Sequence, residues 1–228
     1  VFGDWSSDVC SSDLIVEAQR RGIPLSNDSQ IFLDAAPCKV IGITGSAGKT
    51  TTTTLLGRIA TAATNLADQR PYRKAWVGGN IGTPLIADVD QMDSSDLAVM
   101  ELSSFQLEIM KSSPQVAAIL NVTPNHLDRH GTMQDYINAK SQILAYQTPN
   151  DWAVLNRDDP VAWSLRDQAR GRVLSFGLSE LAPEESGAYL QDGQILIRQE
   201  ETQTVLSVSE IQLRGEHNLL NVMAACTL

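Results

Sequence analysis

The chain has 228 residues and a formal net charge of −10. This acidic balance argues against a non-specific nucleic-acid surface and against binding to anionic membranes, because both attract basic patches. The length suits one well-buried domain plus a smaller unit. We therefore expect a small-molecule ligand, with no nucleic-acid or membrane partner.

The cysteines and the apolar runs bear on the compartment. Cys10, Cys38 and Cys226 lie far apart and form no C-x-x-C pair, so neither a zinc knuckle nor a disulfide framework is indicated. No apolar run approaches the roughly 20 residues of a membrane span, and no signal-peptide pattern is present. We expect a protein of the reducing cytoplasm.

Both ends of the sequence resemble cut ends. The sequence does not begin with Met, and the apolar residues of 1–14 show neither helical nor strand periodicity. We therefore expect residues 1–14 to be non-native or disordered. Residues 15–37 indicate a helix, a short strand and a second helix, with a break at 22–24, and suggest the tail of a preceding unit. At the other end, HNLLNVMAACTL stops inside an apolar helical pattern without a stop signal.

A strand, a glycine-rich turn and a helix follow one another after this tail. The run KVIGITG (39–45) predicts a buried strand, and KTTTTTLLGRIATAAT (49–64) predicts a helix that begins directly after the turn. A turn placed between a buried strand and a helix N-terminus is the setting of a phosphate-binding loop.

Further apolar runs extend the same alternation. DLAVMELSS (96–104), VAAILNVT (116–123) and DWAVLN (151–156) each predict a strand followed by a helical segment, which favours a parallel sheet covered on both faces. After RVLSFG, two alternating runs flank Asp192-Gly193 and a third lies at 204–213, as in an antiparallel sheet. The expected fold class is α/β, a P-loop mononucleotide-binding parallel sheet with flanking helices plus a small antiparallel β-sheet.

The turn reads TGSAGKT at positions 44–50, which is shorter than the common pattern G-x-x-x-x-G-K-[ST]. That pattern would need a glycine in place of Ile43. A lysine in such a turn can reach β- and γ-phosphate oxygens while backbone N–H groups surround them. Lys49 therefore predicts phosphate binding, against the alternative of an ordinary turn with a solvated lysine. The Thr50 hydroxyl falls where it would bind Mg²⁺.

Other candidate residues are ambiguous from the sequence pattern. Glu101 ends a predicted buried strand, where a carboxylate is costly to bury unless it meets a cation or is otherwise satisfied. His126 and His130 have the spacing of one helix face, but a zinc site would lack the Glu of H-E-x-x-H and a third ligand. Lys140, within DYINAKSQIL, has the pattern of a surface lysine with a buried stem.

Four ordered stretches accompany the short loop: GGNIG (78–82), ELSSFQLE (101–108), NVTPNHLDRHG (121–131) and GEHNLLN (215–221). With them, the chain from about residue 15 onward resembles the Mur ligases of bacterial cell-wall synthesis, which use the T-G-x-x-G-K-[ST] loop. The resemblance implies ATP-dependent amide synthesis, in which a carboxylate attacks the γ-phosphate and an amine then displaces phosphate from the acyl phosphate. The four stretches imply UDP-N-acetylmuramoyl-L-alanine and D-glutamate as the two substrates.

The resemblance also implies roles for individual residues. The phosphates would be held by Gly45, Ser46, Ala47, Gly48, Lys49, Thr50 and Thr51, and the rest of the nucleotide would meet Asn218 and Asn221. Thr50 and Glu101 would support one Mg²⁺, and His126 a second. Lys140 matches the family's carbamylated lysine, whose CO₂-derived carbamate helps hold the second metal, so the resemblance overrides the surface-lysine interpretation. Asn80 and Ser103 match positions that face the muramoyl-alanine portion. The catalytic set would be Lys49, Glu101, His126 and Lys140.

The implied organisation is that of an incomplete ligase. Residues 15–37 would be the tail of an N-terminal domain for the UDP-substrate, residues 38–228 the central ATP-binding domain, and the C-terminal amino-acid-binding domain would be absent. A monomer is expected, inactive as a fragment. Asn125 stands where the family more often has an acidic residue, and its effect on metal binding is open.

Alternatives from two classes stay open. A sibling Mur ligase or folylpolyglutamate synthase would share the loop but differ at GGNIG and ELSSFQLE. A non-catalytic nucleotide-binding module would use the loop only as a switch. That module requires no convergence of Glu101, His126 and Lys140, whereas the ligase needs all three beside one Mg-nucleotide.

Overall fold

The computed structural model describes residues 15–18, 20–66 and 70–228. Residues 1–14, expected to be non-native or disordered, lie outside this range. Within the described part of the chain, nine strands form one sheet in the order β2-β3-β1-β4-β5-β6-β7-β8-β9. The strands are β1 (Lys39–Thr44), β2 (Ala75–Gly79), β3 (Leu97–Glu101), β4 (Val116–Ile119), β5 (Trp152–Asn156), β6 (Arg172–Phe176), β7 (Gly187–Gln191), β8 (Gln194–Arg198) and β9 (Thr202–Ser207).

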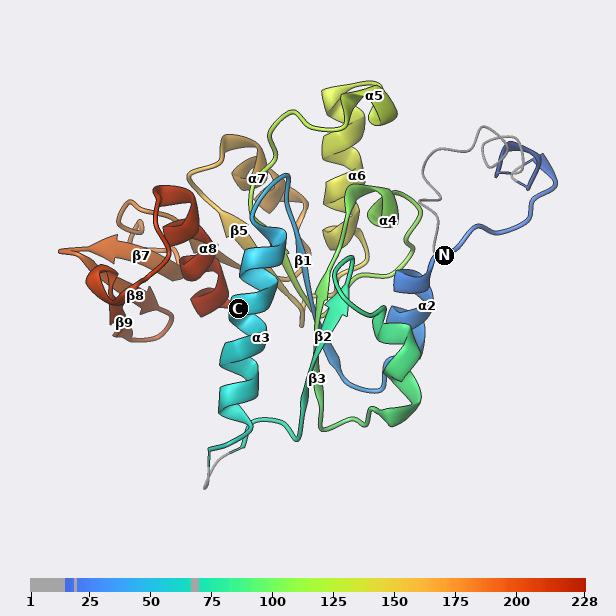
Figure 1. The fold of residues 1–228 in the computed structure, drawn as a ribbon. Helices are drawn as coiled ribbons and strands as arrows, with labels where there is room; N and C mark the ends of the chain where they lie inside the picture. The colour runs from blue at the N-terminus through green and yellow to red at the C-terminus, as the bar shows by residue number, and fades with distance from the viewer. Residues whose placement is uncertain (1–14, 19, 67–69) are drawn as a thin grey trace.

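Helices cover both faces of this sheet (Figure 1). On one face lie α3 and α8, and on the other lie α2, α4, α6 and α7. The α-helices are α2 (Asp28–Ala35), α3 (Lys49–Ala63), α4 (Ser104–Glu108), α5 (Leu127–His130), α6 (Met133–Ala145), α7 (Pro160–Ser164) and α8 (Glu216–Thr227). Three 3-10 helices complete the described elements: η1 (Leu85–Gln91), η2 (Leu165–Gln168) and η3 (Val208–Glu210).

The central strands are apolar between their ends because both of their faces are buried. In β1, Val40 packs into the core on the α6 side, and its neighbour Ile41 packs into the core on the α3 side. Ala98 and Val99 of β3 alternate in the same way. Successive side chains of a strand point to opposite faces, so a strand between two helical layers must be apolar throughout.

The expected fold class is confirmed. Strands β2 to β7 pair in parallel, and β7, β8 and β9 pair antiparallel. The turn between β7 and β8 is Asp192-Gly193, with φ of 49° and 72°, which is the conformation that a two-residue hairpin turn requires. The antiparallel strands continue the edge of the parallel sheet.

Two local expectations were incomplete or wrong. Strand β2 was not predicted, because only Trp76 and Val77 of its five residues favour a strand and Gly78-Gly79 end it at once. The short strand expected before α2 does not form, since residues 23–27 have no strand partner. Instead α2 packs on the sheet through Phe32, which is 0% exposed.

The position of β1 explains where a ligand would bind. From β1 the chain crosses to β2, returns to β3 beside β1, and then passes to β4 on the other side of β1. Ligands of open α/β sheets bind at such a reversal, outside the carboxyl ends of the strands. The loop after β1 lies at this point. Of the described helices, none combines the length and apolar character needed to cross a membrane.

Candidate functional site

Residues 45–48 form the loop between β1 and α3. Gly48 has φ of 84°, and a Cβ there would come within 2.2 Å of Asn221 Oδ1, so only glycine fits. The first intrahelical bond of α3 runs from the N–H of Thr52 to the carbonyl of Gly48. The N–H groups of residues 48–51 therefore have no acceptor inside the helix and form a ready anion-binding site.

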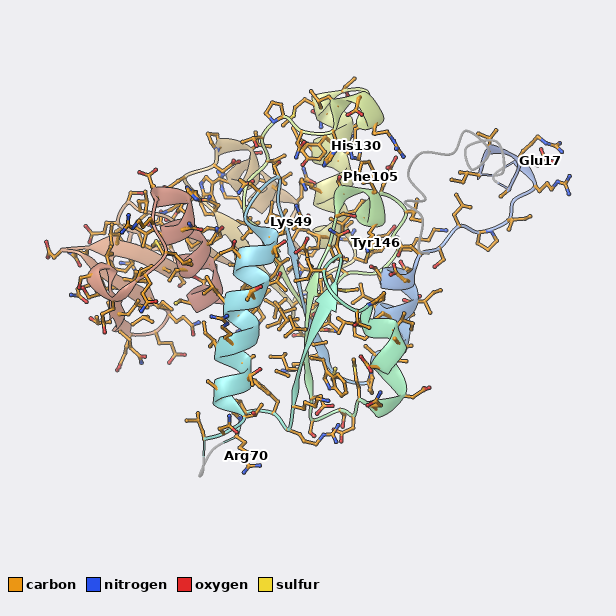
Figure 2. The ribbon with its side chains drawn as sticks, viewed as in Figure 1. Glu17, Lys49, Arg70, Phe105, His130 and Tyr146 are labelled. Carbon is orange, nitrogen blue, oxygen red and sulfur yellow. The ribbon has the colours of Figure 1, made fainter. Side chains whose placement is uncertain are left out.

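Lys49 is the first residue of α3, and its Nζ donates to the carbonyl of Gly45 at 3.1 Å. The side chain thus curls over the loop that it follows (Figure 2). This is the placement that a phosphate-binding lysine needs, because the ammonium and the free N–H groups lie on the same turn.

Glu101 ends β3 beside the loop, and its side chain is 2% exposed. One carboxylate oxygen accepts from the Thr50 hydroxyl at 2.9 Å, and the other accepts from Asn80 Nδ2 at 3.1 Å. The N–H of Asn80 also donates to the carbonyl of Glu101 at 2.9 Å. The end of β2, the end of β3 and the start of α3 therefore meet at one buried carboxylate.

Ser103 begins α4 with a reciprocal cap. Its hydroxyl donates to Gln106 Oε1 at 2.9 Å and accepts from the N–H of Gln106, whose side chain also accepts from the N–H of Ser103. Gln106 Nε2 in turn donates to the Ser29 hydroxyl of α2 at 2.9 Å. The turn that carries Ser103 is thereby fixed to α2.

Lys140 is buried, with 1% of its surface exposed, so its sequence-pattern interpretation as a surface lysine is wrong. It extends from α6 to the loop, where Nζ donates to the Gly45 carbonyl at 2.9 Å, the carbonyl that Lys49 also contacts. The Tyr136 ring lies 4.7 Å from the Lys140 ammonium. Tertiary packing of α6 decides this placement.

Burial lowers the pKa of Lys140 to about 7, and the charge of Lys49 adds to the effect. Between this pKa and the ordinary lysine value, the unfolded chain holds a proton that the folded chain has released, so stability rises with pH. Below pH 7 both states are protonated, and the cost of the buried charge is fully present.

We expect the free energy of unfolding to rise between pH 7 and 9 more steeply in the unchanged chain than in Lys140→Met. The difference in slope should reach up to about 1.4 kcal/mol per pH unit. Urea denaturation of both chains from pH 6 to 9, in metal-free and CO₂-free buffer, measures it. Equal slopes would show that Lys140 stays protonated in the folded chain.

His126 and His130 both contact the ring of Phe105. The His130 ring stacks on Phe105 with centroids 4.9 Å apart, and the His126 ring meets it edge-on at 5.4 Å. Figure 2 labels Phe105 and His130 near each other. His130 Nε2 also lies 2.9 Å from the Ser104 hydroxyl. Among the described residues, no three His, Cys, Asp or Glu side chains gather as a metal site.

One small cavity, of about 180 Å³, brings half of the predicted site residues together. It lies at the carboxyl ends of β1, β2 and β3. Its lining includes the predicted residues Gly45, Ser46, Lys49, Asn80, Ser103, His126 and Lys140. Glu101 adjoins it through Asn80 and Thr50.

The two predicted nucleotide contacts of α8 lie on the other side of the loop. Asn221 is 6% exposed, and its Oδ1 lies 3.4 Å from the Thr52 hydroxyl, which donates to it. Its Nδ2 donates to Asn218 Oδ1 at 3.3 Å, and Asn218 Nδ2 donates to the carbonyl of Arg214. Both amides are thus held at the helix that begins after Gly215.

The sequence interpretation missed several residues of the site. The Tyr136 hydroxyl is hydrogen-bonded to the Ser46 hydroxyl at 3.0 Å, and Tyr136 lies one helix turn before Lys140, so the four-residue spacing could have indicated it. Asn121 holds the loop through its side-chain amide. Its place directly after a predicted strand was the available signal.

This chain is similar in sequence and in fold to known proteins. The sequence pattern of the Mur ligase middle domain matches residues 43–228, most of the chain. The chain belongs to the Mur ligase family. UDP-N-acetylmuramoylalanine–D-glutamate ligases of Symbiobacterium thermophilum and Clostridium kluyveri are 44% and 42% identical to it over 212 and 218 residues. The alignments cover 92% and 95% of the chain but 45% of each relative, so the chain spans less than half the length of these curated relatives.

Solved structures of Mur ligases have the same fold. A crystal structure of MurF from Acinetobacter baumannii superposes with a TM-score of 0.60 and 27% identity, covering 85% of this chain and 43% of that one. MurF from Thermotoga maritima, solved in complex with ADP, gives a TM-score of 0.52 at 24% identity, covering 86% of this chain and 46% of that one. The second likeness concerns the fold alone.

Proposed function

We propose that this Mur ligase chain is the ATP-binding part of an enzyme that joins D-glutamate to UDP-N-acetylmuramoyl-L-alanine through an acyl phosphate. One observation carries the proposal: the phosphate loop with Lys49 shares a cavity with Asn80, Ser103, His126 and Lys140. A nucleotide switch would need the loop alone. The relatives named as D-glutamate ligases support the choice of amine.

The donor set at the loop fits Mg²⁺. The Thr50 hydroxyl and the Glu101 carboxylate lie 2.9 Å apart, and both are the oxygen ligands that this cation prefers. Mg²⁺ is commonly held by one or two protein groups together with phosphates and waters, so a larger protein cluster is not required. When bound, it would neutralise charge on the phosphates. We propose a second Mg²⁺ at His126 and Lys140.

Lys140 suits modification by CO₂ in this site. Its Nζ is buried, and the Lys49 ammonium contacts the same carbonyl, so two cations crowd one oxygen. Carbamylation would replace one of the two positive charges with an anion able to hold Mg²⁺. The lowered pKa of Lys140 supports this step, because only the neutral amine reacts with CO₂.

Each group of residues at the site would have its own role in phosphoryl transfer. The N–H groups of residues 48–51 and Lys49 would bind and orient the nucleotide phosphates, so that the substrate carboxylate meets the γ-phosphate in line. Ser103 and Asn80, on the neighbouring strand ends, would face the muramoyl-alanine portion. Asn218 and Asn221 would contact the nucleotide from the side of α8.

The remaining proposals concern the protein around the site. Residues 15–37 would end an N-terminal domain for the UDP-substrate and residues 38–228 would form the central ATP-binding domain. Because Phe32 of α2 packs on the sheet, the two proposed domains are in direct contact at their boundary. Partners are ATP, UDP-N-acetylmuramoyl-L-alanine and D-glutamate, and we propose a cytoplasmic monomer.

The test is amide formation by the full-length protein. With ATP, Mg²⁺ and UDP-N-acetylmuramoyl-L-alanine, D-glutamate should yield an amide and one phosphate per turnover. L-glutamate, a diamino acid and D-alanyl-D-alanine should yield none. Product with one of these amines instead would contradict the choice of D-glutamate. Nucleotide binding without any amide would support the switch or a sibling ligase with another UDP-substrate.

The 228 residues alone should bind Mg-nucleotide weakly and form no amide, because this chain spans 45% of its relatives and the second step needs a surface for D-glutamate. The same assay on this chain tests the expectation. Amide formed by the chain alone would show that the domain division is wrong.

A further inference from the structure

The segment after β4 lies along the phosphate loop and is hydrogen-bonded to it through Asn121 and Thr123. The N–H of Ser46 donates to the carbonyl of Asn121 at 2.9 Å. The Ser46 hydroxyl donates to the carbonyl of Thr123 and accepts from the N–H of Thr123, both at 2.9 Å. Residues 121–123 thus fix the first half of the loop.

Asn121 adds a contact that a backbone would otherwise make. Its Oδ1 accepts from the N–H of Ala47 at 2.9 Å, and its Nδ2 donates to the carbonyl of Ala47 at 3.0 Å. This reciprocal pair is the pattern that two strand residues exchange in an antiparallel ladder. A primary amide provides both halves, whereas an ionised carboxylate has no donor for the carbonyl.

These bonds determine which loop N–H groups are available. The N–H groups of Ser46 and Ala47 are both occupied by Asn121, through its main chain and its side chain. The N–H groups of residues 48–51 have no intrahelical acceptor. The donors left to an anion therefore begin at Gly48.

We infer that Asn121 is a positioning residue for the phosphate loop, whose side-chain amide holds Ala47 so that the N–H groups of residues 48–51 face the nucleotide phosphates. The inference rests on the proposed nucleotide-binding function. Gly45 agrees with it, since a Cβ there would come within 3.0 Å of Leu120 Cβ and 3.1 Å of the Ala47 carbonyl. The loop and the segment after β4 are packed as one unit.

This arrangement also links two parts of the site. His126, which lines the cavity, lies five residues after Asn121 in the same connection. His126 has φ of 53°, an uncommon conformation for a residue with a side chain. A displacement of Asn121 would therefore shift both the loop and the path to His126.

The experiment compares Asn121→Ala and Asn121→Asp in the full-length protein. The dissociation constant for MgADP is measured by calorimetry below the melting temperature of every variant, together with KM for ATP and for the UDP-substrate. Asn156→Ala is the matched control. Asn156 ends the parallel strand β5, is 4% exposed, and donates its amide to the carbonyl of Leu120 at 2.8 Å. Its side-chain oxygen accepts from the N–H of Asp158, so neither end of its amide is used to hold Ala47.

Both Asn121 variants should weaken MgADP binding about tenfold or more, because Asn121→Ala loses both hydrogen bonds to Ala47 and Asn121→Asp loses one and sets a carboxylate against the Ala47 carbonyl. KM for ATP should rise in step, and KM for the UDP-substrate should stay within about threefold. Asn156→Ala should lower the melting temperature at least as much and leave MgADP binding within about threefold. Asn121→Asp is decisive, because it keeps the side-chain volume but removes the donor to Ala47.

Wild-type affinity in Asn121→Asp would overturn the inference, since it would mean that the side chain only fills space. Equal losses in the Asn156 control would overturn it too, because general destabilisation would then explain the effect. If the unchanged protein fails to bind MgADP, the proposed function itself fails and this inference with it.

Discussion

Replacing Lys49 with alanine is expected to lower turnover by at least about a hundredfold and to weaken nucleotide binding. Lys49 begins α3 and curls over the loop to the Gly45 carbonyl, so its ammonium lies on the same turn as the free N–H groups of the helix. Removal of one preorganised donor of this kind from a transition state commonly costs about 10²- to 10³-fold in rate. The measurement is the rate of phosphate release and the dissociation constant for MgADP in the full-length protein.

Lys74→Ala is the control for this prediction. Lys74 lies just before β2, at the amino edge of the sheet, and its Nζ sits 3.2 Å from the centroid of the Trp76 ring. It carries the same charge at the opposite edge from the loop. Turnover should be unchanged in Lys74→Ala, and an unchanged turnover in Lys49→Ala as well would remove the basis for a phosphate loop.

The second large effect on turnover is expected at Lys140, because the proposed carbamate is an anion where the unmodified chain has an ammonium. Lys140→Ala should lose at least about a hundredfold in turnover. A short carboxylic acid added to the assay should restore part of it, since the acid fills the vacated space and supplies the missing charge. Lys140→Arg should be inactive and should not be rescued, because arginine keeps a cation there and occupies the space.

These variants separate a carbamate from a structural lysine. A lysine that served only to bond the Gly45 carbonyl would be replaced at least in part by arginine, and added acid would have no effect on the alanine variant. Full activity of Lys140→Arg would therefore refute the carbamate. Dependence of the unchanged enzyme on dissolved CO₂ is an independent readout.

The strand, turn and helix around the loop could be predicted because their signals are local. The apolar run of β1 and the glycines specify the strand and the turn, and Leu56 and Ala60 after the five threonines have the four-residue spacing of one helix face. The same holds for the Asp192-Gly193 hairpin. Strand β2 could not be predicted this way, because its short, glycine-ended sequence becomes a strand only beside β3.

The residues of the candidate site could also be predicted only in part. Lys49, Glu101 and His126 could be proposed from their positions after predicted strands, since such residues gather at the carboxyl edge of a parallel sheet. Asn121 and Tyr136 were missed. Their positions, after a predicted strand and one helix turn before Lys140, were available signals, but their contacts with Ala47 and Ser46 exist only in the tertiary structure.

The sequence by itself determined that this protein has a parallel α/β sheet with a phosphate loop, and, through ordered motifs, that it resembles the Mur ligases. These properties depend on residue types and spacings within single elements. Only the tertiary structure decided that Lys140 is buried against the loop, that Glu101 joins Thr50 to Asn80, and that α2 is fixed to the start of α4. Contacts between segments that are far apart in the chain create burial and charge environments, so a residue's pattern on its own helix cannot reveal them.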